Sequence, residues 1–124
     1  MKHYLLLPED SIDFLPEEDG AEAAISVFCE RTMIVFPCSK LTCAAMARDV
    51  TEDRLRRLDC LELTARDALF DVPQQILIPV TRPDYKPLLK ALQTARPDLF
   101  AQLPDRTFAP ETCDQTGSHL HRHE

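Results

Sequence analysis

Three residues with reactive side chains, Cys38, Ser39 and Lys40, lie together directly after an apolar run of the chain. A cysteine beside a lysine and a helix N-terminus can have its thiol pKa lowered, which turns the thiol into a nucleophile. The alternative is that Cys38 and Cys43 are small apolar residues of the core, since free cysteine is among the most buried residue types. We favour this second interpretation, because a nucleophilic cysteine is usually paired with a base. The histidines that could supply one, His3 and a group near the C-terminus, are far from Cys38 in the sequence.

A second group of residues with possible chemistry lies near the C-terminus and has the side chains of a metal site: Cys113, His119, His121 and His123. Thiolate and imidazole ligands suit zinc, copper or nickel. Structural zinc sites, however, usually take their ligands from short paired spacings in a folded knuckle, and the run HLHRHE has neither feature. The pattern favours a solvated tail, and we expect no metal and no other cofactor.

The segment from Pro8 to Glu22 concentrates the negative charge of the chain. It holds seven of the 21 Asp and Glu residues and no Lys or Arg, so the remaining 14 acids equal the 14 Lys and Arg in number. Three apolar residues, Ile12, Phe14 and Leu15, lie among these acids. They either pack onto the domain or anchor a partner whose basic surface the acids attract. The sequence thus predicts a partner-binding set made of Glu9, Asp10, Asp13, Phe14, Leu15, Glu17, Glu18 and Asp19.

Several other functions are disfavoured by composition. Outside the acidic segment, positive and negative charges are equal in number. This argues against direct nucleic-acid binding, which needs clustered cations to displace phosphate counterions. The two glycines, Gly20 and Gly117, follow no predicted strand, which argues against a glycine-rich phosphate loop. No apolar run approaches the ~20 residues that span a bilayer, and the first is shorter than the roughly 7–15 residues of a signal-peptide core. With five cysteines in no regular pairing, we expect reduced thiols, a cytoplasmic location and no membrane partner.

Short apolar runs bounded by proline predict the strands that must position these side chains. They cover residues 3–7, 32–36 and 74–80. The second run, TMIVF, is rich in β-branched residues and predicts a buried strand. In the third run, Pro79 predicts that the strand stops near Ile78 or lies at a sheet edge, because proline donates no hydrogen bond.

Helical spacing of apolar residues predicts four helices, over residues 20–30, 39–49, 51–70 and 84–96. For the first, Asp19 and Glu22 have the spacing of a capping box. The alternative is that residues 21–29 form a strand in a hairpin with TMIVF. We favour the helix, since the connecting Glu30-Arg31 lacks the Gly or Asn that a two-residue turn prefers. The helix over 51–70 rests on regularly spaced leucines and on acid–arginine pairs four residues apart.

Together these elements predict an α+β fold, with a small three- or four-stranded mixed sheet packed by about four helices. Residues 1–110 form a single compact domain in this prediction, and residues 111–124 form a mobile tail. A small α/β domain is the alternative.

The predicted function is that of a non-enzymatic intracellular interaction factor, of the inhibitor, immunity or accessory type. Its acidic segment engages a basic site on a partner protein. Two alternatives remain open: a small thiol-dependent enzyme that uses Cys38 with Lys40, and a structural homodimer.

Overall fold

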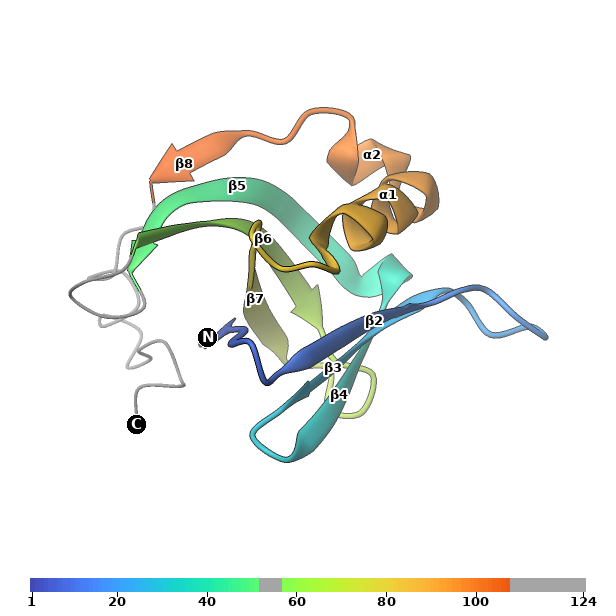
Figure 1. Cartoon of the computed structure of the whole chain (residues 1–124). Coiled ribbons are helices and arrows are strands. Elements are labelled where there is room, and N and C mark those ends of the chain that lie inside the picture. Colours follow the sequence, from blue (N-terminus) through green and yellow to red (C-terminus); the bar gives the residue numbers. More distant parts are fainter. Residues whose placement is uncertain (52–56, 108–124) are drawn as a thin grey trace.

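The fold consists mainly of β-structure. The computed structural model describes residues 1–51 and 57–107, which form two sheets, two α-helices and a short 3-10 helix (Figure 1). In chain order the elements are β1 (Lys2–Leu5), β2 (Ser11–Leu15), β3 (Ala24–Cys29), β4 (Thr32–Pro37), η1 (Cys38–Lys40), β5 (Leu41–Thr51), β6 (Arg57–Arg66), β7 (Pro73–Pro79), α1 (Tyr85–Ala95), α2 (Pro97–Phe100) and β8 (Asp105–Thr107).

This architecture corrects the predicted α+β fold with about four helices around one small sheet. Three of the four predicted helical segments are wrong: 20–30 contains β3, 39–49 contains the end of η1 and most of β5, and 51–70 contains β6. Residues 52–56 of the third segment lie outside the described residues. The helix over 84–96 is confirmed as α1. A molecule dominated by strands, most of them paired antiparallel, also differs from the small α/β alternative.

The larger sheet has five strands in the order β1-β7-β6-β5-β8 and is strongly arched (Figure 1). Its three central strands, β5, β6 and β7, pair antiparallel. At the two edges of the sheet, β1 pairs parallel to β7 and β8 pairs parallel to β5. The predicted strands over 3–7 and 74–80 are confirmed as β1 and β7. Because Pro73 and Pro79 lie at the two ends of β7, this strand can take an interior place without losing a hydrogen bond in its middle.

The smaller sheet is an antiparallel meander of β2, β3 and β4. Side chains alternate between its two faces. One face is buried against the large sheet and α1 and includes Ile12, Ile25, Val27 and Phe36. The strand predicted for TMIVF is confirmed as β4, but only Phe36 in it is buried. Met33 and Val35 lie on the other face, here called the outer face, where Met33 is exposed.

Both turns of this meander use left-handed backbone. The β3–β4 turn has φ of 52° at Glu30 and 62° at Arg31, so the prediction against a hairpin was wrong. Such a conformation costs roughly 1–2 kcal/mol per non-glycine residue, and the six-residue pairing of β3 with β4 offsets it. Between β2 and β3, Asp19 (φ 48°) and Gly20 (φ 83°) form the tip of a hairpin, which is closed by reciprocal backbone hydrogen bonds between its flanking residues.

Helix α1 covers the core between the two sheets and is amphipathic, with Tyr85, Leu88 and Leu92 buried. Within the described part of the chain, no helix is both long enough and apolar enough to cross a membrane.

Candidate functional site

The acidic segment forms strand β2 and the tip of the β2–β3 hairpin. Asp10, at its start, is buried, and its carboxylate accepts a hydrogen bond from the Leu7 N–H at 2.8 Å. The Asp10 carbonyl accepts another from the guanidinium of Arg82 at 2.9 Å. Asp10 therefore stabilises the corner before β2 and lies inside the fold, whereas Glu9 and Asp13 are exposed.

Strand alternation divides the apolar residues of this segment between two roles. Ile12 is buried and Phe14 is partly buried against the core, as expected if they fix the segment to the domain. Leu15 points to the outer face and is 42% exposed. The structure thus shows packing for Ile12 and Phe14 and exposure for Leu15, and the role of Leu15 as a partner anchor stays a prediction.

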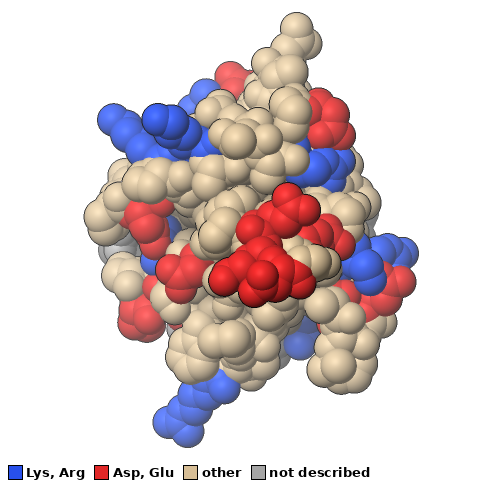
Figure 2. Space-filling view, turned by 90° about the vertical axis from the view of Figure 1, so that its right-hand side faces the viewer, with Lys and Arg blue, Asp and Glu red and all other residues tan. Residues whose placement is uncertain are grey.

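The hairpin tip projects from the molecule and carries a group of carboxylates. Figure 2 views the molecule from the side of this projection and shows Asp and Glu at the centre of the face, with Lys and Arg toward its margin. Glu17, Glu18, Asp19 and Glu22 are all exposed. The Ser39 hydroxyl and N–H both donate to the Glu22 carboxylate at 2.9 Å, and these bonds lower the pKa of Glu22 from its ordinary value.

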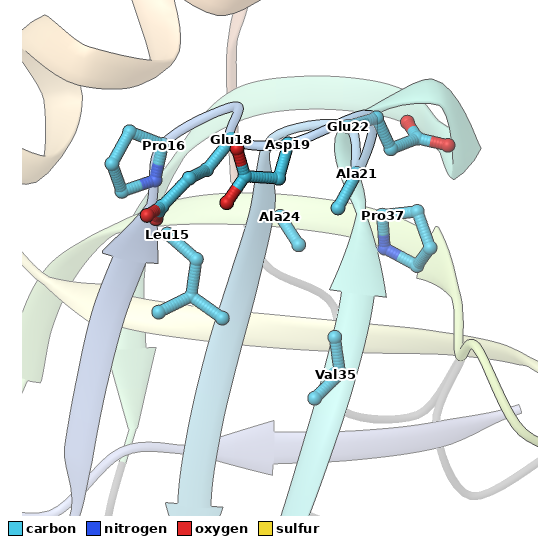
Figure 3. Close-up of a pocket in the computed structure, with 9 residues that line it drawn as sticks. All are labelled: Leu15, Pro16, Glu18, Asp19, Ala21, Glu22, Ala24, Val35 and Pro37. Carbon is cyan, nitrogen blue, oxygen red and sulfur yellow. The ribbon is translucent and has the colours of Figure 1, made fainter.

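A hollow of about 560 Å³ lies beneath this tip on the outer face (Figure 3). Its floor is apolar, with Leu15 from β2, Ala24 from β3 and Val35 from β4. The carboxylates of Glu18 and Asp19 lie above this floor in Figure 3. No Lys or Arg occurs among the described residues that line it. An apolar floor beneath exposed carboxylates suits a lysine or arginine side chain, which combines an aliphatic stem with a charged head.

A second concave region, of about 670 Å³, lies beside the edge of β4. Most of its lining residues are apolar, and three of them are strongly exposed: Met33 (63%), Leu69 (80%) and Phe70 (74%). Lys2 also lines it. We call this region the apolar groove. The Ala68 N–H donates to the Val35 carbonyl at 2.8 Å and holds the β6–β7 turn against β4. Large apolar side chains gathered on a surface are typical of interaction sites.

The apolar groove was not predicted from the sequence. Leu69 and Phe70 were predicted at the end of a long helix, and Met33 was predicted in a buried strand. A turn signal was nevertheless present, because Asp67 and Asp71 surround these residues and Pro73 follows them. What no sequence pattern indicated was the contact of this turn with β4.

The predicted thiol site has a different environment from the one that activation requires. Cys38 is buried in η1, and burial raises the pKa of its thiol, the opposite direction from an activated cysteine. The predicted helix after it is absent, since the chain continues directly into β5. The Lys40 ammonium lies 3.0 Å from the carboxylate of Asp71. The geometry thus gives no support to the thiol-enzyme alternative, which stays a prediction.

The predicted tail, 111–124, and its possible metal ligands, Cys113, His119, His121 and His123, lie outside the described residues. Within residues 1–51 and 57–107, no group of three or more His, Cys, Asp or Glu side chains is arranged to hold a metal ion.

No protein-family model matches the chain, and no curated protein or solved structure matches it significantly. The function of this protein is therefore inferred from the chemistry of its own surface. Its main features are the hollow beneath the hairpin tip, here called the acidic hollow, and the apolar groove.

Proposed function

We propose that this protein is a non-enzymatic interaction factor that binds a basic site on a partner protein through the tip of the β2–β3 hairpin. The observation that carries the proposal is the hollow in which Glu18 and Asp19 lie above an apolar floor, without a cation among the described lining residues. An inhibitor, an immunity protein or an accessory factor would each use such a surface. The cytoplasmic location expected from the sequence is part of the proposal.

Two physical properties of the tip support this function. Exposed carboxylates on a projecting hairpin attract a basic partner from a distance and orient it before contact. The apolar floor then supplies the burial that keeps the partner bound. The Ser39 contacts with Glu22 tie the tip to η1, so less conformational freedom is lost on binding.

The proposal is tested by affinity capture from a lysate of the native cell, with the full chain as bait at low ionic strength. The test variant carries Glu18→Gln and Asp19→Asn. The control carries Asp49→Asn and Asp105→Asn, which remove the same charge from exposed positions away from the hairpin. The two variants are matched in charge and in one backbone position, because Asp19 (φ 48°) and Asp49 (φ 57°) both have left-handed backbone, which asparagine tolerates. The control also removes the exposed ion pair of Asp105 with Arg48 at 3.1 Å, so its folding is verified by circular dichroism.

We expect wild type and control to retain the same basic protein, and the test variant to lose it. Retention of that protein by all three chains would show that the acidic tip does not bind it, and the proposed function would be wrong.

A further inference from the structure

The acidic hollow and the apolar groove share one residue. Val35 of β4 lines both, so the two regions meet at this residue. On the outer face of β4, Pro37 continues into the hollow and Met33 into the groove. Thr32 and Ile34 line the groove from the opposite face of the strand. A ligand that occupies one region therefore lies next to the other.

Strand geometry gives the distance between the two regions. Met33, Val35 and Pro37 alternate along β4 and present their side chains to the same face. The strand advances by four residue steps from Met33 to Pro37, which corresponds to roughly 13 Å. This is also the reach of about four residues of an extended ligand laid along the strand.

The β6–β7 turn is fixed in place although its apolar side chains are exposed. The Asp67 carboxylate accepts hydrogen bonds from the N–H groups of Phe70 at 2.7 Å and Val72 at 2.8 Å. The Ala68–Val35 hydrogen bond and the Lys40–Asp71 ion pair attach the same turn to β4 and η1. A groove held in this way is preformed, which reduces the entropy lost when a ligand binds.

We infer that one extended segment of the partner crosses the outer face at Val35 and occupies both regions. A large apolar side chain of the segment lies in the groove against Leu69 and Phe70. A lysine or arginine about four residues away lies in the hollow at Glu18 and Asp19. This inference rests on the proposed function and adds to it the chemistry and spacing of the recognised segment.

Charge complementarity favours such a segment over a second copy of the chain. A two-fold symmetric dimer brings the same surface of each subunit together. Each copy carries a formal net charge of -7, and this like charge opposes the approach of a second copy to the acidic tip. A foreign segment that carries a cation avoids this repulsion.

The test selects random linear peptides displayed on phage for binding to the full wild-type chain in low salt. Affinities of the selected peptides are then measured by fluorescence anisotropy for wild type and for two variants, Glu18→Gln/Asp19→Asn and Leu69→Ser/Phe70→Ser. Both variants change exposed side chains only, and circular dichroism verifies that they fold. Asp49→Asn/Asp105→Asn is the charge control.

We expect the selected peptides to share a Lys or Arg about four residues from a large apolar residue. Each variant should weaken binding by about ten-fold or more, with a strong salt dependence only for the loss caused by the acid variant. Replacing the apolar peptide residue by alanine should couple to Leu69→Ser/Phe70→Ser in a double-mutant cycle, and replacing the cation should couple to the acid variant.

Three results would overturn the inference: no peptide is selected, the selected peptides lack the pair, or Leu69→Ser/Phe70→Ser leaves affinity unchanged. A wild-type dimer in sedimentation that Leu69→Ser/Phe70→Ser dissociates would assign the groove to a second copy instead.

If capture of the partner protein still requires the acidic tip in any of these cases, the proposed function stands without this inference. If capture does not require it, the proposed function itself fails.

Discussion

At the scale of single residues, the Asp67 carboxylate is the group that shapes the exposed β6–β7 turn. It is buried, and it accepts two backbone hydrogen bonds from the turn and one from the Gln74 side chain at 3.3 Å. Burial acts to raise the pKa of Asp67, but the N–H groups of Phe70 and Val72 donate to the charged form and outweigh it, so the pKa is lowered. The apolar groove thus depends on an ionised carboxylate beneath it.

This gives a prediction about acid stability. A carboxyl whose folded pKa is depressed contributes stability fully above its unfolded pKa of about 3.9, and the contribution is lost as pH falls through the folded value. Asp67→Asn should lower the free energy of unfolding by about 1–3 kcal/mol at neutral pH, since hydrogen bonds to a charged acceptor are lost. In urea titrations the gap between wild type and variant should shrink below about pH 4. The same gap at neutral and acid pH would show that the charge of Asp67 has no role.

The cysteines give a second prediction at this scale. Cys43 is exposed, Cys38 is buried with a raised pKa, and burial raises the pKa of Cys60 to about 12. Iodoacetamide near pH 8 should therefore alkylate Cys43 well before the other two, because the thiolate is the reacting form. Mass spectrometry of tryptic peptides over time measures this order, with urea-unfolded protein as the control that equalises the rates. If Cys38 in the folded protein reacted as fast as Cys43, the thiol-enzyme alternative would regain support.

At the scale of elements, the strands bounded by proline and the helix α1 could be predicted, whereas β5 and β6 could not. β6 is buried on both faces, with Leu61 and Leu63 toward the main core and Cys60 on the opposite side, so the alternation that marks a half-buried strand is missing. Its buried Glu62 pairs with Arg106 of β8 across the sheet, and the local sequence contains no sign of that partner. Leucines and acid–arginine pairs at such spacings also satisfy a helix, and only long-range pairing selects the strand.

The same distinction applies to the candidate site. The acids of the hairpin tip and Leu15 were predicted because one continuous segment contains them. Met33, Leu69 and Phe70 were missed because their proximity arises from the contact of the β6–β7 turn with β4, two segments far apart in the chain. Asp19-Gly20 was assigned to a helix start although Asp-Gly is also a strong hairpin signal.

The β3–β4 turn allows a prediction about an element. Arg31 has φ of 62°, a conformation that glycine adopts without steric cost. Arg31→Gly should raise the free energy of unfolding by up to about 1 kcal/mol, since the relief of strain exceeds the added entropy of the unfolded chain. Gly20→Ala is the opposite control: Gly20 has φ of 83° with no atom within 4 Å of an added Cβ, so strain alone should destabilise that variant. Urea denaturation of both measures the effect, and a loss of stability in Arg31→Gly would show that the arginine side chain contributes more than its backbone costs.

At the scale of the whole molecule, the charge distribution and the shape agree. The sequence outside residues 8–22 has equal numbers of acidic and basic residues, and the structure places most of the excess acids on a hairpin that projects from the body (Figures 1 and 2). The apolar surface that would stabilise a complex begins directly beneath that projection. Long-range attraction and short-range burial therefore act on the same side of the protein.

The final prediction separates these two contributions by kinetics, measured by surface plasmon resonance with the partner recovered in the capture experiment. Glu18→Gln/Asp19→Asn should slow association by about ten-fold at low ionic strength, and most of this difference should vanish at physiological salt, where charges are screened over ~8 Å. Leu15→Ala should instead speed dissociation with little change in association, because Leu15 is exposed on the floor of the hollow. Phe14→Ala should mainly lower stability, since Phe14 packs against the core. An acid variant that associates at the wild-type rate in low salt would mean that the hairpin charges do not guide the partner, and the electrostatic part of the proposed function would be lost.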